Sequence, residues 1–155
     1  MRAKSKVPDV IEAAAIFAII SHECTHIIHC AGVVRMNLPI EVARQHAVTA
    51  TENVVKLALA CKAAGNPIKK IEFVSTVGVG GCLPGVLQET WITTPREYHN
   101  TYEQAKAEAE DYLKNQIALH LLPVTVHRPS MVVGDSKTGK IIHFQVFYHI
   151  CEFLS

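Results

Sequence analysis

The sequence has no surplus of either charge and few aromatic side chains. Fifteen Lys and Arg residues face fourteen Asp and Glu residues, for a formal net charge of +1 at pH 7. No strong field would therefore attract a nucleic acid or an anionic membrane. Aromatic residues make up 6% of the chain, which offers no platform on which nucleic-acid bases could stack. We therefore expect no nucleic-acid partner.

Long hydrophobic runs are also absent. The N-terminus has a basic start and then an apolar run, as a signal peptide would, but Asp9 and Glu12 interrupt it and no small-x-small cleavage site follows. The uninterrupted part, residues 13–20, is far too short to span a bilayer. We expect a core helix there, and neither a membrane span nor a secretion signal.

The five cysteines are an odd number and do not form a disulfide framework. They are scattered, and two lie in apolar runs, so reduced thiols and a cytoplasmic location are expected. With 155 residues, of which 49% are hydrophobic and 19% charged, the chain is long enough for one globular domain with a real core.

The stretch SHECTHIIHCAG, residues 21–32, concentrates histidine and cysteine. If it were extended, one face would carry four residues that zinc accepts as ligands, and His29 would lie on the other face. These four are His22, Cys24, His26 and Cys30. Structural zinc sites usually join two ligand pairs from separated segments, whereas here Ile27 and Ile28 lie in the middle and no turn residue precedes Gly32. We predict a short buried strand and no metal site, with a metal-binding module as the weaker alternative.

Apolar periodicity predicts alternating helices and strands along the rest of the chain. The expected helices are residues 8–21, 38–64, 101–120 and 140–155, and the expected strands are 25–32, 68–81 and 121–134, with a loop at 82–100. This order is typical of an α/β fold with a partial Rossmann-like, doubly wound parallel sheet and flanking helices. The strands are apolar runs, so we expect them to be buried on both faces.

Chemistry is expected where the strands end, because ligands of such sheets bind beyond the carboxyl ends of the strands. The segment TYEQAK places Tyr102 and Lys106 four residues apart, on one face of a helix. An ammonium near a phenol lowers the pKa of the phenol, which could then exchange a proton with a carbonyl oxygen. Thr76, or Ser75 as second choice, could hold that oxygen. This set suits hydride transfer at a carbonyl, with a cofactor carrying the hydride.

The ordered motifs HCAGVV, VSTVGV, YEQAK and LPVTVHRPSMVVGDSKTG resemble the extended short-chain dehydrogenase/reductase superfamily. Within it they are most similar to the thioester reductase and fatty acyl-CoA reductase branch, the male sterility NAD-binding group. The turn RPS followed by GDSKTG is the most specific part. The resemblance runs from about residue 25 to residue 155.

The resemblance implies a role for each matching residue. Tyr102 would be the proton donor, and Lys106 would bind the nicotinamide ribose and lower the pKa of Tyr102. Thr76 would be the catalytic hydroxyl, with Ser75 beside it. The remaining cofactor contacts would come from two pairs: Ala31 and Gly32 on the adenosine-ribose and pyrophosphate side, and Pro129 and Val132 near the nicotinamide.

The activity implied is reduction of an acyl thioester to an aldehyde or alcohol with NADP(H), which is favoured over NAD(H). The substrate would be an acyl-CoA or an acyl-carrier-protein thioester, and a homodimer could form through helices 38–64 and 101–120. The alternatives are a nucleotide-sugar epimerase/dehydratase or hydroxysteroid dehydrogenase of the same superfamily, or a non-catalytic remnant.

Two departures from the family pattern leave open whether the chain is an enzyme by itself. The family has an Asn in the helix after the first strand of this set, where HAVTATENV places Ala47, or His46 if the alignment slips by one. The superfamily also begins with a strand and a Gly-rich turn that seats the pyrophosphate, whereas no glycine precedes Gly32. We therefore expect an incomplete NAD(P)-binding domain without the substrate lobe, and weak or no activity alone.

Overall fold

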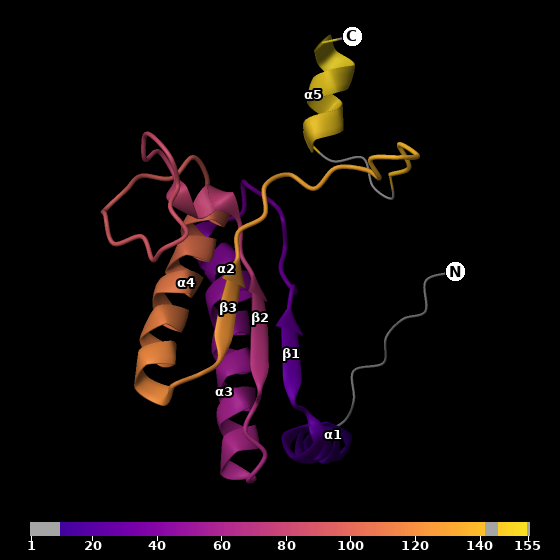
Figure 1. Cartoon of the computed structure of the whole chain (residues 1–155), viewed down its shortest axis with the longest axis vertical. Helices are drawn as coiled ribbons and strands as arrows, with labels where there is room; N and C mark the ends of the chain where they lie inside the picture. Colours follow the sequence, from indigo (N-terminus) through magenta and orange to yellow (C-terminus); the bar gives the residue numbers. More distant parts are fainter. Residues whose placement is uncertain (1–9, 142–145, 155) are drawn as a thin grey trace.

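The computed structural model describes residues 10–141 and 146–154 of the chain (Figure 1). Three strands alternate with helices, as expected from the apolar periodicity. In chain order the elements are α1 (Val10–Glu23), β1 (His26–His29), α2 (Ile40–Arg44), the π-helix η1 (Gln45–Thr49), α3 (Ala50–Ala63), β2 (Lys70–Val74), the 3₁₀-helix η2 (Val77–Gly80), α4 (Thr101–His120), β3 (Val124–His127) and α5 (Val146–Leu154).

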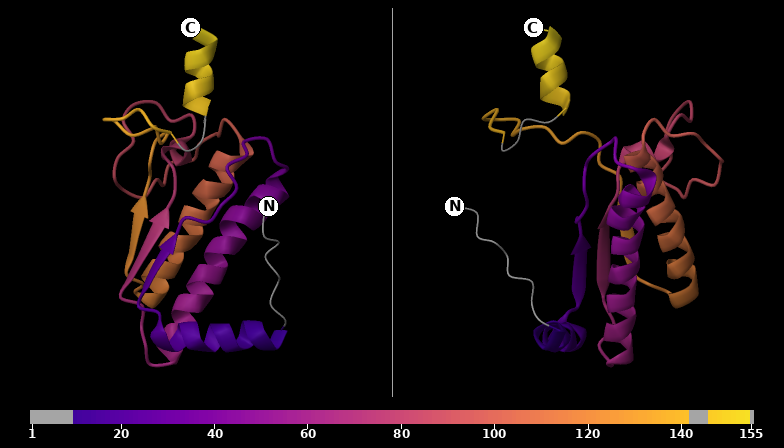
Figure 2. Two further views of the ribbon diagram at one scale, coloured as in Figure 1. Left: turned by 90° about the vertical axis from the view of Figure 1, so that its right-hand side faces the viewer. Right: turned by 180° about the vertical axis from the view of Figure 1, so that it is seen from behind.

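The strands form one parallel sheet in the order β1-β2-β3. The connections from β1 to β2 and from β2 to β3 move in the same direction across the sheet. Right-handed crossovers therefore place their helices on the same face. Figure 2 shows α3 and α4 together on one side of the sheet, with α1 lying across its lower end. The predicted fold class, a partial Rossmann-like parallel sheet with flanking helices, is confirmed.

The core lies between the sheet and these helices. Its largest fully buried side chains include Phe73 and Ile71 of β2, Val55 of α3 and Leu113 of α4. Small alanines of α4, such as Ala105 and Ala109, are buried in this core, where the helix packs most closely against α2 and η1. The alanine-rich composition of residues 101–120 therefore serves close packing as well as helix propensity.

The predicted helix 38–64 is confirmed as α2, η1 and α3 in continuous succession, but its π-helical turn was not expected. In a π-helix the hydrogen bonds span five residues, and such turns occur often at functional sites. The buried hydroxyl of Thr51 donates to the carbonyl of Ala47, 2.7 Å away, which gives that carbonyl a partner at the turn.

The expectation that the strands are buried on both faces is wrong for the described residues. Ile28 of β1 is 72% exposed, on the face away from α3 and α4. On the same face, Glu72 accepts from His127 Nε2 at 2.7 Å, and Lys70 donates to Thr125 at 2.5 Å. Four polar side chains of β2 and β3 thus bind one another on this face, so the helix-facing residues alone account for the core.

The strands are shorter than the apolar runs that predicted them. β1 and β2 end at His29 and Val74, where pairing in the ladder ends, and the residues that follow are irregular or 3₁₀-helical. The first helix continues to Glu23, and its expected start at residues 8 and 9 lies outside the described residues. All five cysteines are free. No helix in the described ranges has the length and hydropathy needed to cross a membrane.

Ile71 and Ile28 offer a matched test of this one-sided core, since they are the same residue in adjacent strands at 1% and 72% exposure. Ile71→Ala should lower the free energy of unfolding by about 2–5 kcal/mol, as for other buried truncations. Ile28→Ala should cost less than about 1 kcal/mol. Urea unfolding monitored by circular dichroism measures both, and equal costs would contradict the assignment of the core.

Candidate active site

The carboxyl ends of β1 and β2 open into a hollow of about 120 Å³. Five of the predicted site residues line it: Ala31, Gly32, Ser75, Tyr102 and Lys106. They come from the segment after β1, the end of β2 and the first two turns of α4. The sheet topology therefore brings together residues up to 75 positions apart in the sequence, between Ala31 and Lys106.

Lys106 is the most constrained of these residues. It is 7% exposed, its Nζ donates to the carbonyl of Val74 at 2.8 Å, and the same atom lies 4.5 Å from the centre of the Phe73 ring. Burial lowers the pKa of Lys106 to about 8, and the charge of Glu110 partly opposes this shift. A cation this close to neutrality can respond to a bound anion or proton acceptor at working pH.

The pKa of Tyr102 contradicts one expectation. We predicted that the Lys106 ammonium would lower it, but burial raises the pKa of Tyr102 above its usual value. The physical reason is the direction of Lys106, whose ammonium is engaged at the end of β2 with the Val74 carbonyl and the Phe73 ring. The phenol is therefore protonated at neutral pH, which suits a proton donor.

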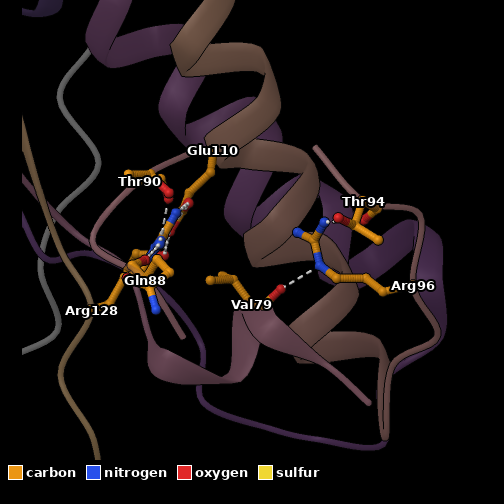
Figure 3. Close-up of polar contacts among 8 residues, drawn as sticks. Val79, Gln88, Thr90, Thr94, Arg96, Glu110 and Arg128 are labelled. Atoms are coloured by element: carbon orange, nitrogen blue, oxygen red, sulfur yellow. Dashed lines mark hydrogen bonds and ion pairs between the residues drawn. The ribbon is translucent and has the colours of Figure 1, made fainter. Parts of the chain in front are cut away.

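The carboxylate of Glu110, on α4, binds residues that follow two strands, β2 and β3 (Figure 3). Ser75 donates its hydroxyl to Glu110 at 2.5 Å, and Arg128, after β3, reaches both carboxylate oxygens at 2.6–3.2 Å. Arg128 also donates to the carbonyls of Gln88 and Thr90 in the long loop. The pair is nearly solvent-free, with side chains 14% and 4% exposed for Arg128 and Glu110.

This network separates the roles of the two candidate hydroxyls. Ser75 lines the hollow, but its proton is committed to Glu110, so it is poorly placed to donate to a substrate oxygen. Thr76 does not line the hollow, and its hydroxyl oxygen accepts from the backbone N–H of Gly78 at 3.1 Å. No described residue receives the Thr76 proton, so this hydroxyl keeps a proton to give. The preference for Thr76 over Ser75 stays a prediction.

Besides Thr76, two other predicted residues lie apart from the hollow. Pro129 lines a wider, open depression of about 1,020 Å³ beside β3 and residues 87–91, and its carbonyl accepts from Val77 N at 3.1 Å. Val132 is 65% exposed and lines neither space. The larger depression is shallow and holds none of the titratable pair Tyr102 and Lys106, so the smaller hollow is the better site for chemistry.

Both residues that align with the expected family Asn line the hollow. His46 and Ala47 lie in the π-helical turn of Gln45–Thr49, which faces the segment after β1. Ala47 offers no hydrogen-bonding side chain, whereas the imidazole of His46 has two nitrogens. The π-turn itself had no signal in the apolar pattern.

The histidine- and cysteine-rich stretch forms a strand over His26–His29. His29 is buried, 5.4 Å from the ring of Phe73 between centroids, and burial, followed by the charge of Lys106, lowers its pKa. In the part of the chain that the structure describes, no three His, Cys, Asp or Glu side chains are arranged to hold a metal ion.

Glu110 and Arg128 are candidate site residues that the sequence-based prediction missed. Their signals were present, since Glu110 lies four residues after Lys106 on the same helix face as Tyr102, and Arg128 directly precedes the predicted Pro129. What the spacing does not reveal is that their side chains meet Ser75.

The hollow fits part of a dinucleotide. Small-molecule sites typically enclose about 300–1,000 Å³, and this one has about 120 Å³. A Cβ added at Gly32 would meet no atom within 4 Å, so the exposed segment after β1 leaves open space beside it. The residues present could therefore hold the nicotinamide-ribose end, with Lys106 and Tyr102 toward the ribose.

The chain was compared with known protein families and with individual proteins. The sequence profile of an NAD-binding family described as "Male sterility protein" matches residues 13–154. A hybrid PKS-NRPS synthetase from Acremonium sp is 32% identical over 105 residues, which cover 66% of this chain and 2% of the synthetase.

Two solved structures extend the comparison. The terminal R domain from the myxalamid PKS-NRPS biosynthetic pathway is 30% identical, with a TM-score of 0.67, and the match covers 81% of this chain and 31% of that one. UDP-N-acetylglucosamine 4-epimerase from Methanobrevibacter ruminantium M1, in complex with UDP-N-acetylmuramic acid, is 28% identical, with a TM-score of 0.54 over 73% of this chain and 35% of that one. The chain thus spans about a third of each solved relative.

The buried Lys106 predicts a specific pH dependence. Its folded-state pKa of about 8 lies below the ordinary 10.5, so the folded protein binds fewer protons between these values and stability rises with pH there. From pH 7.5 to 9.5 the free energy of unfolding should rise by about 2 kcal/mol more in the natural chain than in Lys106→Met. Urea unfolding at both pH values measures this difference. Lys56 is exposed, so Lys56→Met should show the same change in the free energy of unfolding between the two pH values as the natural chain. If Lys106→Met also showed that same change, Lys106 would not be a buried charge with a lowered pKa.

The Glu110–Arg128 pair predicts a large cost on truncation. Glu110→Ala would leave Arg128 buried without its carboxylate and should lower the free energy of unfolding by about 3–5 kcal/mol. Glu41→Ala removes a carboxylate that is 79% exposed and also paired with an arginine, Arg44, and should cost less than about 1 kcal/mol. Thermal or urea unfolding compares the two, and similar costs would show that the buried pair does not hold the strand ends.

Proposed function

This chain belongs to the male sterility protein family, an NAD-binding family, and we propose that it forms the catalytic strand-end site of an NAD(P)H-dependent thioester reductase. The observation that carries the proposal is the hollow in which Tyr102 and Lys106 meet the segment after β1. Its substrate would be an acyl thioester on coenzyme A or a carrier protein, reduced to an aldehyde or an alcohol.

The state of each side chain supports this reaction. When bound, the reduced nicotinamide would supply a hydride to the carbonyl carbon of the thioester. Tyr102 is protonated, because burial raises its pKa, and its phenol can give a proton to the oxygen that becomes negative. The Thr76 hydroxyl can stabilise the same oxygen. The Lys106 ammonium, with a pKa of about 8, adds positive charge at neutral pH, and Glu110 keeps Ser75 and Arg128 in place behind it.

The relatives favour a thioester over other carbonyl substrates. Two relatives of at least 30% identity are a hybrid PKS-NRPS synthetase and the terminal R domain of a PKS-NRPS pathway. The chain covers 2% and 31% of them, so substrate, carrier and the expected preference for NADP(H) are part of the proposal. Dimerisation through the helices of residues 38–64 and 101–120, and a cytoplasmic location, stay predictions.

A nucleotide-sugar epimerase is the second candidate, favoured by the 28% identity to the solved 4-epimerase. The two reactions differ in their use of the cofactor. A thioester reductase consumes one reduced cofactor and releases one thiol for each aldehyde formed, whereas an epimerase returns its cofactor to the starting state.

The test is oxidation of NADPH and release of thiol by the 155-residue chain with an acyl-CoA as substrate. At the weak rate expected of the chain alone, one NADPH should be oxidised for each thiol released if the product is the aldehyde, and two if it is the alcohol. We expect Tyr102→Phe to lower this rate by about 10²–10⁴-fold, as for loss of a general acid. Tyr112→Phe serves as the matched control, because Tyr112 is a tyrosine of the same helix, ten residues after Tyr102, and does not line the hollow. Repeated thiol release, beyond one thiol per chain, without NADPH oxidation would refute the proposal, and so would equal rates for both variants.

A further inference from the structure

A second cluster of reactive side chains lies outside the strand-end hollow, between the loop after β2 and the start of α4. Cys82 Sγ is 3.7 Å from His99 Nε2, and His99 Nδ1 is 3.1 Å from Glu103 Oε2. The imidazole thus contacts a thiol with one nitrogen and a carboxylate with the other. This is the order in which a nucleophile, its base and the group that orients the base are arranged in nucleophilic catalysis.

Backbone contacts hold all three residues. Glu103 lies in the first turn of α4, where its N–H donates to Asn100 Oδ1 at 2.9 Å. Its side chain is 16% exposed and packs against Gly78, where an added Cβ would come within 2.8 Å of Glu103 Cγ. Cys82 N donates to the carbonyl of Glu97 at 2.9 Å. These contacts therefore fix the positions of Glu103 and Cys82.

Helix capping explains only part of this arrangement. Glu103 Oε2 also accepts from the backbone N–H of His99 at 3.1 Å, which is a contact typical of an acidic residue in the first turn of a helix. Capping does not require the imidazole to lie between the carboxylate and a thiol, nor the thiol to be exposed. Cys82 and His99 are both exposed, so a ligand can reach them.

We propose that Cys82, His99 and Glu103 form an acyl-acceptor site, at which the Cys82 thiol takes an acyl group from a thioester. The choice of a thioester rests on the proposed function. His99 Nε2 takes the thiol proton, and Sγ attacks the carbonyl carbon. The bond from that carbon to the donor sulfur breaks, and His99 returns the proton to the departing thiol. One thioester is exchanged for another, so no oxidant or reductant is needed.

The surroundings of Cys82 suit this step. An open depression of about 500 Å³ adjoins the thiol and is lined by Cys82, Leu83, Pro95, Arg96 and Glu97. Arg96 is held there by donating to the carbonyls of Val79 and Thr94, at 2.6 and 3.2 Å (Figure 3). Since Arg96 and Cys82 line the same depression, this fixed guanidinium can stabilise the negative oxygen that forms when the carbonyl is attacked.

The first experiment measures alkylation of each cysteine by iodoacetamide at pH 7, by peptide mapping. The other exposed cysteines, Cys30 and Cys151, are internal references within the same chain. Cys82 should react at least tenfold faster than either, and His99→Gln should remove this advantage. Glu103→Gln keeps an acceptor for the helix N-terminus but loses the charge, and should lower the rate of Cys82 by a smaller factor. A Cys82 rate equal to that of Cys30, or unchanged in His99→Gln, would overturn the proposal.

The second experiment uses acetyl coenzyme A without any nicotinamide cofactor. Intact mass and peptide mapping should find one acetyl group on Cys82 that hydroxylamine removes, and none in Cys82→Ser or His99→Gln. A fast-alkylating Cys82 that takes no acetyl group would overturn its role as an acyl acceptor. Because no NADPH is present, acetylation can be found even if the reductase proposal fails, and the reductase can be active even if acetylation is absent.

Discussion

The carboxylate of Glu110 is the contact on which the carboxyl end of the sheet depends. It receives the Ser75 hydroxyl from the end of β2 and the guanidinium of Arg128 from the end of β3, and it does so almost without solvent. Through Arg128 it also reaches the carbonyls of Gln88 and Thr90. Burying a carboxylate costs free energy unless it is paired and hydrogen-bonded. Here the hydrogen bonds that Glu110 accepts from Ser75 and Arg128 also connect the segments after β2 and β3 to α4.

Helix α4 also carries the titratable residues of the candidate active site. Tyr102, Lys106 and Glu110 follow each other at four-residue intervals, so all three face the sheet from one side of α4. Glu110 partly offsets the desolvation of Lys106, whose pKa nevertheless drops to about 8. The result is a protonated phenol and an easily deprotonated ammonium at the ends of β1 and β2, which is what proton transfer at a carbonyl requires.

The sequence predicted this site where it depended on spacing and topology, and missed what depended on packing. Alternation of apolar runs predicted the three parallel strands, and the i, i+4 rule placed Tyr102 with Lys106. The same rules could not show that Lys106 turns toward the Val74 carbonyl, so the expected fall in the pKa of Tyr102 became a rise. Nor could they show that Ile28 is exposed. The sequence pattern of a strand does not reveal which of its faces a helix covers. The π-turn at Gln45–Thr49 has the sequence QHAVT, with few large apolar residues, so the apolar pattern could not reveal a shift of the helical period there.

The central claim is that the strand-end hollow holds a nicotinamide cofactor through Lys106. Titration of the chain with NADPH, followed by energy transfer from Trp91, the one tryptophan of the sequence, tests it most directly when repeated with Lys106→Met. We expect saturable binding in the micromolar to millimolar range usual for enzyme ligands, weakened at least tenfold in Lys106→Met. No saturable binding, or the same affinity in both proteins, would contradict it.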